Sequence, residues 1–248
     1  MTGRIFKYLL NLADKKSVRI LMYHMILPES ESFKNDLIVT KENLEKQFQY
    51  IHEKNFKCLF FKDLSDSEKI DNKIILTFDD GYLNNKIHLL PLLEKYGLKA
   101  TVFIPTQLIE ENQKKADRNL MTFEEIRNLP SNLIEIALHS HQHKNYSEMT
   151  LLEADRDIKV NIESLRRENI AFTKVLAYPY GKFPKEKSMK KEFFEMLKSH
   201  GIFAALRIGN NVESYPFKNA FEVKRIDIKY GDTIQKFKWK LLFGKTKL

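Results

Sequence analysis

Two adjacent carboxylates, Asp79 and Asp80, are the first side chains in this sequence whose types and spacing could do chemistry. They follow an apolar run at residues 74–76 and precede Gly81, whose missing side chain lets the backbone turn sharply. Because side chains alternate across a strand, neighbours at its end point in different directions. One carboxylate can then hold a metal ion while the other faces a substrate. An isolated Asp-Asp-Gly is more often a polar turn, so this interpretation depends on a second motif.

That second motif is a cluster of histidines. Three of the seven histidines fall within five residues, at His139, His141 and His143, directly after the apolar run 133–138. Neutral imidazole is the commonest metal ligand, whereas a purely structural cluster or a histidine-rich surface loop would be unusual here. In an extended chain the outer pair would lie about 13 Å apart, too far for one ion. If the chain coils after His139, residues i and i+4 share a face. We therefore predict His139 and His143 as ligands and His141 as a supporting or exposed residue.

A further histidine, His24, closes the apolar run at 18–24. A lone histidine at such a position is more often structural than catalytic. Strand ends are nevertheless where active sites collect in α/β folds. His24 therefore stays a candidate site residue.

The surrounding elements indicate how these motifs are positioned. Both follow apolar runs typical of strands covered on two faces, as in a parallel sheet. A helical pattern at 87–96 stops at Gly97 and is followed by an apolar run at 100–104. Together with the apolar run at 74–76, this is the order of elements in a strand–helix–strand unit. We therefore predict an α/β fold with right-handed crossovers. Other strands are predicted at 18–24, 56–61, 73–79, 133–138, 173–177, 202–206 and 221–228, and a polar surface excursion at 109–119.

The chain shows no internal repeat, low-complexity tract or break in composition, which favours one domain over residues 1–248. Within it, residues 1–17 are predicted to include a basic amphipathic helix, and residues 229–248 to form a helical extension. The first helix could pack on the domain or rest on an anionic membrane.

Charge and apolar content limit the partners. The 42 Lys and Arg residues against 33 Asp and Glu give a net charge of +9, which favours anionic partners. The basic residues are spread along the chain without interleaved aromatic residues, so no nucleic-acid site is expected. The chain start does not resemble a secretory signal, and no stretch approaches the roughly 20 apolar residues of a membrane span. We expect a cytoplasmic protein that could lie at the inner membrane face.

Taken together, the motifs resemble those of NodB-type polysaccharide deacetylases, also called carbohydrate esterase family four. Residues 77–81 match the first motif, residues 139–143 the second, and residues 177–181 a variant of the third. The similarity covers residues 18–228. It implies a distorted (β/α) barrel of about seven strands, with the site at the carboxyl ends of the strands.

The resemblance also implies roles for individual residues. Asp80, His139 and His143 would bind a divalent metal, usually zinc, with cobalt, nickel or iron as alternatives. Asp79 would act as general base, and the Tyr180 backbone N–H would help to bind the oxyanion. Three protein ligands leave a position open for water, which the metal activates and a nearby carboxylate deprotonates. Residues beside these motifs are expected to contact the substrate: Tyr82, Tyr178 and Pro179.

Two departures from the family pattern stand out. Ala177 occupies the position of an arginine that orients the base in many members, and no downstream segment supplies the partner of that arginine. Residues 225–228 occupy the region where the family has a histidine that acts as general acid, and His200 lies in the wrong context to replace it. These losses together resemble a subgroup acting on exported or surface polysaccharides. We predict His24 as the proton donor to the leaving amine.

The sequence therefore predicts a metal-dependent hydrolase that removes an N-acetyl group from an amino sugar. The substrate would be a surface polysaccharide or its lipid- or nucleotide-linked precursor. Deformylation or another amide hydrolysis on a related sugar is a second interpretation, since it needs the same metal site. A catalytically silent carbohydrate-binding protein is a third. Retention of Asp79 argues against the third, because an asparagine there would bind substrate without serving as a base.

Overall fold

The computed structural model describes residues 17–64 and 72–245. The helix predicted for residues 1–17 lies outside these ranges, apart from Ser17, which begins the first strand. Across the described ranges, no helix combines the length and apolarity that a bilayer span needs.

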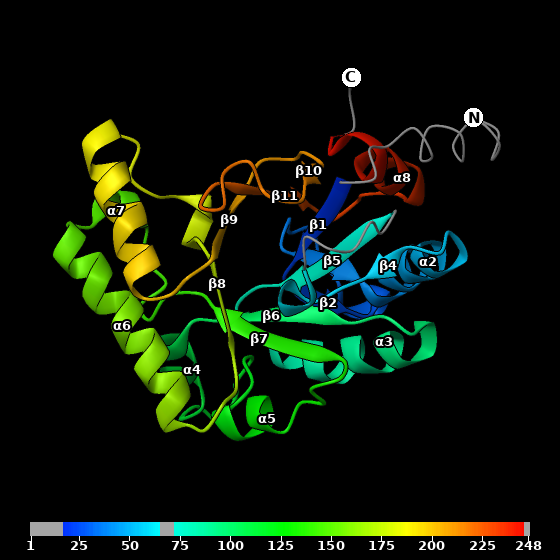
Figure 1. The fold of residues 1–248 in the computed structure, drawn as a ribbon. Helices are drawn as coiled ribbons and strands as arrows, with labels where there is room; N and C mark the ends of the chain where they lie inside the picture. The colour runs from blue at the N-terminus through cyan, green and yellow to red at the C-terminus, as the bar shows by residue number, and fades with distance from the viewer. Residues whose placement is uncertain (1–16, 65–71, 246–248) are drawn as a thin grey trace.

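Seven parallel strands form a closed barrel (Figure 1). The barrel closes because β1 pairs in parallel with β5 on one side and with β11 on the other. The prediction of a distorted (β/α) barrel of about seven strands is confirmed. Its strands are β1 (Ser17–Tyr23), β5 (Lys73–Phe78), β6 (Ala100–Ile104), β7 (Ile134–Leu138), β8 (Thr173–Ala177), β9 (Ala204–Ile208) and β11 (Val223–Asp227). Shorter strands lie beside it: β2 (Met25–Leu27), β3 (Ile38–Thr40), β4 (Lys57–Cys58) and β10 (Glu213–Ser214).

The alternation of apolar side chains explains why these strands are buried on both faces. In β1, Val18 and Ile20 belong to an inner cluster, whereas Leu21 belongs to the outer layer beneath the helices. Several inner positions carry alanine, which lets the strands close around a narrow interior. The inner cluster includes Val18, Ile20, Ile75, Phe103, Ala137, Val175, Ala177, Ala204, Leu206 and Val223.

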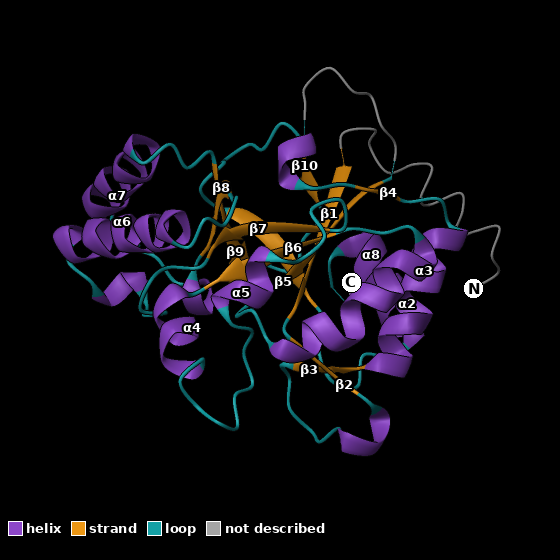
Figure 2. Cartoon of the chain, turned by 90° about the horizontal axis from the view of Figure 1, so that it is seen from below, coloured by secondary structure: helices purple, strands orange, loops and turns teal. Residues whose placement is uncertain are grey.

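Helices surround the barrel and pack their apolar faces on its outer layer (Figures 1 and 2). Four begin at threonine caps: the side chains of Thr40, Thr122, Thr150 and Thr233 each accept a hydrogen bond from the backbone N–H three residues on. In both views α6 and α7 lie side by side, whereas α2, α3 and α8 form another group. The helices are α2 (Lys41–Glu53), α3 (Leu90–Tyr96), α4 (Thr106–Asn112), α5 (Phe123–Arg127), α6 (Leu151–Arg167), α7 (Lys187–Ser199) and α8 (Ile234–Phe243).

The predicted strand at 56–61 is mostly wrong. Only β4 pairs with the barrel, and a short 3-10 helix, Phe61–Asp63, follows it. The cause is Glu135, a buried carboxylate at the start of β7 that accepts bonds from the backbone N–H groups of Phe61 and Lys62, at 3.0 and 3.1 Å. This interaction turns the chain away from a strand path, although the local residues favour one.

Two other boundaries also differ from prediction. The excursion expected at 109–119 begins late, because α4 extends to Asn112 and buries Thr106 and Ile109. The strand expected at 202–206 is displaced to β9, which ends at Ile208. That displacement brings Ile208 to the carboxyl end of the barrel, where it lines a cavity that also contains Asp79 and Asp80.

Candidate metal centre and active site

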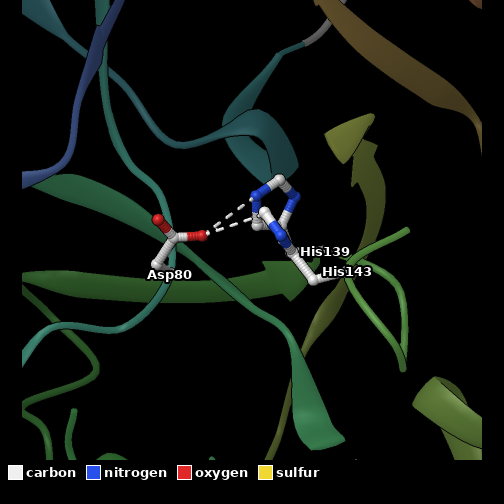
Figure 3. A group of neighbouring side chains, drawn as sticks. All are labelled: Asp80, His139 and His143. Atoms are coloured by element: carbon white, nitrogen blue, oxygen red, sulfur yellow. Dashed lines mark ion pairs between the residues drawn. The ribbon is translucent and has the colours of Figure 1, made fainter. Parts of the chain in front are cut away.

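Three side chains at the carboxyl ends of β5 and β7 converge on one point (Figure 3). The Oδ1 atom of Asp80 lies 3.4 Å from His139 Nε2 and 3.2 Å from His143 Nε2. Tetrahedral zinc with bonds of about 2.0–2.1 Å requires ligand atoms about 3.3 Å apart, so these separations fit one ion. Asp80 Oδ1 is also buried without a hydrogen-bond donor, as expected of an oxygen that a cation would satisfy.

Left-handed backbone conformations produce this convergence. Asp80 and Gly81 have φ values of 72° and 69°, so the chain reverses immediately after β5. Ser140 has a φ of 66°, and its hydroxyl accepts a hydrogen bond from His143 N at 2.8 Å. The chain therefore coils after His139, as predicted, and brings the His139 and His143 rings to a centroid distance of 4.8 Å.

The ring of His139 is fixed by a carbonyl. Its Nδ1 atom lies 2.7 Å from the Ala177 carbonyl oxygen, which can only accept a hydrogen bond. Nδ1 must therefore carry the proton, leaving the Nε2 lone pair directed at Asp80. Burial lowers the pKa of His139, but the neighbouring charges of Asp79 and Asp80 outweigh it and raise the pKa.

Asp157 on α6 supports the histidine loop, and sequence reasoning missed it. Its carboxylate accepts bonds from the backbone N–H groups of His141 and Gln142, at 2.8 and 3.2 Å to Oδ2. The His141 ring instead contacts Thr106, with 2.9 Å between Nδ1 and Oγ1. His141 is therefore a supporting residue, as predicted, and lies outside the group Asp80, His139 and His143, which could hold one metal ion and is here called the ligand cluster. The available signal for Asp157 was a charged residue on the side of α6 that also carries the apolar residues Ile158 and Ile162.

Asp79 is held by Arg225, a second residue that sequence reasoning did not assign. Arg225 Nη1 and Nη2 each lie 2.7 Å from one carboxylate oxygen of Asp79. The expectation that the carboxylate lacks an orienting arginine is therefore wrong: β11 supplies it in place of residue 177. Burial alone would raise the pKa of Asp79, but Arg225 and His139 outweigh this effect and hold the pKa below its usual value. The feature of the sequence that could have identified Arg225 is a charged residue within the strand predicted at 221–228.

His24 lies beside the same carboxylate. Its Nε2 atom is 3.8 Å from Asp79 Oδ2, and its side chain is 15% exposed, so solvent and ligands can reach it. The structure thus brings His24, Asp79 and the ligand cluster together at the carboxyl end of the barrel.

The third motif contributes Tyr180. This residue has a φ of 57° and is 63% exposed, and its ring packs edge-on against His143 at a centroid distance of 5.1 Å. Tyr178 is buried, and its hydroxyl donates to the Phe221 carbonyl at 3.0 Å. Both tyrosines line the central cavity.

The other two predicted substrate contacts do not line that cavity. Pro179 is buried behind Tyr180 in the turn. The Tyr82 hydroxyl faces Asp80, and burial together with the charge of Asp80 raises the pKa of Tyr82. Substrate contact by Tyr82 and Pro179 remains a prediction.

Two cavities meet at this site. The central cavity, of about 280 Å³, holds Asp79, Asp80, His139 and His24 on its walls. A second, larger cavity of about 630 Å³, here called the side cavity, shares His143 and Tyr180 with the first. The remaining lining of the central cavity is Met22, Asp36, Leu37, His143, Tyr178, Tyr180, Gly181, Ile208, Arg225, Asp227 and Lys229.

The closed parallel barrel and the Asp/His/His cluster at its carboxyl end match the arrangement expected of a NodB-type deacetylase. The chain belongs to the polysaccharide deacetylase family, whose model matches residues 66–202. The predicted relationship to NodB-type deacetylases is confirmed at the level of the family.

Individual relatives agree with this assignment. A Bacillus subtilis (strain 168) protein named "Putative polysaccharide deacetylase YxkH" is 27% identical over 184 residues, covering 71% of this chain and 62% of that protein. The chain thus spans less than two thirds of that relative's length. The structure of Streptococcus pyogenes deacetylase PplD in complex with acetate matches with a TM-score of 0.75 at 20% identity, over 91% of this chain and 98% of that one. BC0361, a polysaccharide deacetylase from Bacillus cereus, matches with a TM-score of 0.73 at 21% identity, over 91% and 69%. Both structures share the fold.

Proposed function

We propose that this protein is a metal-dependent hydrolase that removes an N-acetyl group from an amino sugar of a surface polysaccharide or its lipid- or nucleotide-linked precursor. The observation that carries the proposal is the position of an arginine-bound carboxylate, Asp79, next to the Asp80/His139/His143 cluster. A purely structural metal site does not require a further carboxylate, such as Asp79, that is held beside the ligands by its own arginine. Family membership supports the deacetylase class.

The ligand cluster suits a divalent ion with a preference for nitrogen and oxygen, most simply zinc. Asp80, His139 and His143 would hold it, leaving coordination positions open toward the central cavity. When bound, the ion supplies Lewis acidity, which polarises the amide carbonyl and lowers the pKa of water.

Asp79 would accept the proton of the attacking water. Arg225 keeps this carboxylate ionised, which is the form that a base needs, and fixes its orientation through two bonds. The Oδ2 atom lies 3.9 Å from His139 Nε2, so the base borders the ligand cluster. The amide bond then breaks, and the leaving amine requires a proton.

His24 is the proposed donor of that proton, since it lies beside Asp79 and lines the central cavity. The Tyr180 backbone N–H is the proposed hydrogen-bond donor to the negative charge that develops on the carbonyl oxygen as water attacks the carbonyl carbon. Pro179 before it has a fixed φ, which makes this turn rigid and reduces reorganisation during the reaction.

The first experiment combines metal content and acetate release. Purified protein is analysed for zinc, nickel, cobalt and iron, and assayed on a panel of N-acetylated amino sugars and oligosaccharides. We expect a bound metal and acetate release that Asp79→Asn abolishes. Asp117→Asn, which changes an exposed aspartate after α4, is the matched control and should behave as wild type.

Other results would change the proposal. Release of formate from N-formylated sugars without release of acetate would make the protein a deformylase. Bound metal with sugar binding but no hydrolysis would make it a silent carbohydrate-binding protein. Absence of bound metal after loading would contradict the proposal at its centre.

A further inference from the structure

One largely buried acidic side chain on the wall of the central cavity has no role in the proposed mechanism. Asp227, the last residue of β11, lines this cavity together with His24 and Asp79. Its side chain is 13% exposed, so burial raises the pKa of its carboxyl, and Lys229, Lys240 and His24 only partly offset that effect. A carboxylate in such a position requires a hydrogen-bond donor.

The direction of the Asp227 side chain follows from strand alternation. On β11, Val223 belongs to the inner cluster of the barrel and Ile226 to the outer layer, so residues 223, 225 and 227 point inward. Arg225 follows this pattern, because its guanidinium binds Asp79. Asp227 therefore lies one layer above Arg225, toward the open carboxyl end of the barrel, and faces the cavity.

The neighbouring strand β1 brings the proposed proton donor to the same place. Met22 is the register partner of Asp227, and the Ile228 N–H donates to the Met22 carbonyl at 3.0 Å (Figure 1). Met22 and His24 are two residues apart and both line the cavity. Asp227 thus borders the part of the cavity in which the leaving amine would be protonated.

The backbone of Asp227 is fixed, whereas its carboxylate keeps acceptor capacity for a ligand. The Asp227 N–H donates to Asn210 Oδ1 at 2.9 Å, and the Lys240 ammonium donates to the Asp227 carbonyl. Among the described residues, the carboxylate forms one ion pair, with Lys229, whose Nζ lies 3.6 Å from Oδ2 and is too distant for a good hydrogen bond. Lys229 instead lies 2.7 Å from Asp36.

The size of the cavity would bring a bound sugar to this carboxylate. At about 280 Å³ the central cavity is slightly smaller than the roughly 300–1,000 Å³ typical of small-molecule sites. A sugar whose N-acetyl group is at the ligand cluster therefore has to fill most of this space, including the part beside Asp227. Sugars offer hydroxyl donors. A cationic group fits less well, because Lys229 already supplies a positive charge to Asp227 and Asp36.

We propose that Asp227 is a substrate-binding residue that accepts a hydrogen bond from a hydroxyl group of the sugar whose N-acetyl group is removed. This inference rests on the proposed function and narrows its substrates to amino sugars in which that hydroxyl is free. The residue also determines specificity, because a sugar without the hydroxyl would cover the carboxylate and leave it without a donor.

The test removes the two partners of this contact one at a time. Substrates are an N-acetylglucosamine disaccharide with a labelled acetyl group on its non-reducing residue, and three analogues in which that residue lacks the 3-, 4- or 6-hydroxyl. We expect Asp227→Ala to lower kcat/KM on the parent disaccharide by about ten- to a hundredfold, the range for a hydrogen bond to a charged group. One analogue should lower wild-type kcat/KM by a similar factor, and on that analogue Asp227→Ala should have little further effect.

Controls separate a substrate contact from a structural role. Asp227→Ala should keep the wild-type metal content and melt no lower than wild type, because Asp36 still binds Lys229 and the backbone hydrogen bonds of residue 227 remain. Asp227→Asn, which keeps one acceptor oxygen, should lose less activity than Asp227→Ala. Asp117→Ala, which changes an exposed aspartate after α4, is the matched control and should keep wild-type kcat/KM on every substrate.

Two results would overturn the inference while leaving the deacetylase proposal standing. The first is wild-type kcat/KM for Asp227→Ala on the parent disaccharide. The second is an equal loss for Asp227→Ala on the parent and on all three analogues. If that equal loss is absent with an activated aryl ester, whose leaving group needs no proton, Asp227 acts through His24 as a positioning residue.

Binding measurements distinguish failure of this inference from failure of the proposed function. Calorimetry of Asp79→Asn with the parent disaccharide should show binding that the added Asp227→Ala change weakens, and that one of the three analogues weakens equally. If wild type releases no acetate but this pattern holds, the proposed function fails and the hydroxyl contact stands. If Asp79→Asn binds the parent and all three analogues alike, the contact does not exist.

Discussion

Arg225 and Asp79 form a bidentate ion pair although they lie 146 positions apart in the chain. Both side chains are almost fully buried, with exposed fractions of 1% and 3%. A buried carboxylate is tolerated only when it is paired, and here the pairing also fixes both of its oxygens in space. The ion pair leaves an ionised, oriented carboxylate beside the Asp80/His139/His143 cluster, where the proposed mechanism requires a base.

Replacing Arg225 by methionine should reduce kcat by about 10²-fold or more, because Asp79 loses its orientation and its stabilising charge. The variant should also lose about 3–5 kcal/mol of unfolding free energy through the unpaired buried carboxylate. Since Arg225 lowers the pKa of Asp79, the acidic limb of the kcat/KM profile should move to higher pH. Arg225→Lys should recover stability more than kcat. A wild-type pH profile for Arg225→Met would contradict this role.

Removing the metal should abolish activity without unfolding the barrel, because the ligand cluster lies at its rim and outside the apolar interior. Chelation followed by dialysis should give inactive protein, and addition of zinc should restore activity. Zinc at a hundredfold excess over its Kd should raise the unfolding free energy by about 2.7 kcal/mol. His139→Ala and His143→Ala should each lose metal and activity, whereas His52→Ala, an exposed histidine on α2, should retain both.

His24→Gln should reduce kcat by about 10²- to 10⁴-fold on amide substrates, the range expected for loss of a general acid. The metal content should not change, because His24 is outside the ligand cluster. A substrate whose leaving group needs no proton, such as an activated aryl ester, should be much less affected. Equal losses on both substrates would assign His24 to binding or structure.

Asp157→Asn should weaken metal binding by about ten- to a hundredfold, since the carboxylate positions the loop between His139 and His143. The replacement keeps the size of the side chain but removes one of the two acceptor oxygens. Competitive titration with a coloured chelator measures the affinity. If kcat of the metal-saturated variant stays near that of wild type, the role of Asp157 is positioning.

Glu125 should contribute stability that acid removes. Burial opposes ionisation, but Arg118, the Thr122 N–H and Lys86 outweigh it and lower the pKa of Glu125 from 4.5 to about 2. The folded state therefore binds this proton more weakly than the unfolded state, so the stabilisation is full above pH 4.5 and is lost as pH falls toward 2. Glu125→Gln should melt at a lower temperature than wild type at pH 7, and the difference should shrink between pH 4.5 and 2. A constant difference would contradict this assignment.

Most of the fold could be predicted from local patterns. The barrel strands are apolar on both faces, and helix starts such as those at Thr122 and Thr150 carry their capping residues in the sequence. The strand expected at 56–61 shows the limit. Its residues favour a strand, but Glu135, more than 70 residues away, binds the backbone N–H groups of Phe61 and Lys62 and imposes a turn.

By itself the sequence predicted the three side chains that converge as a candidate metal site, Asp80, His139 and His143, and the carboxylate that lies beside them. Asp79, Asp80 and the histidines follow apolar strands directly, and parallel strands deliver their carboxyl ends to one face. Only the tertiary structure decided that Arg225 binds Asp79, that Asp157 holds the histidine loop, and that Asp227 lines the central cavity. These pairings depend on barrel closure and strand register, which join segments far apart in the chain, and local periodicity carries no information about such distances.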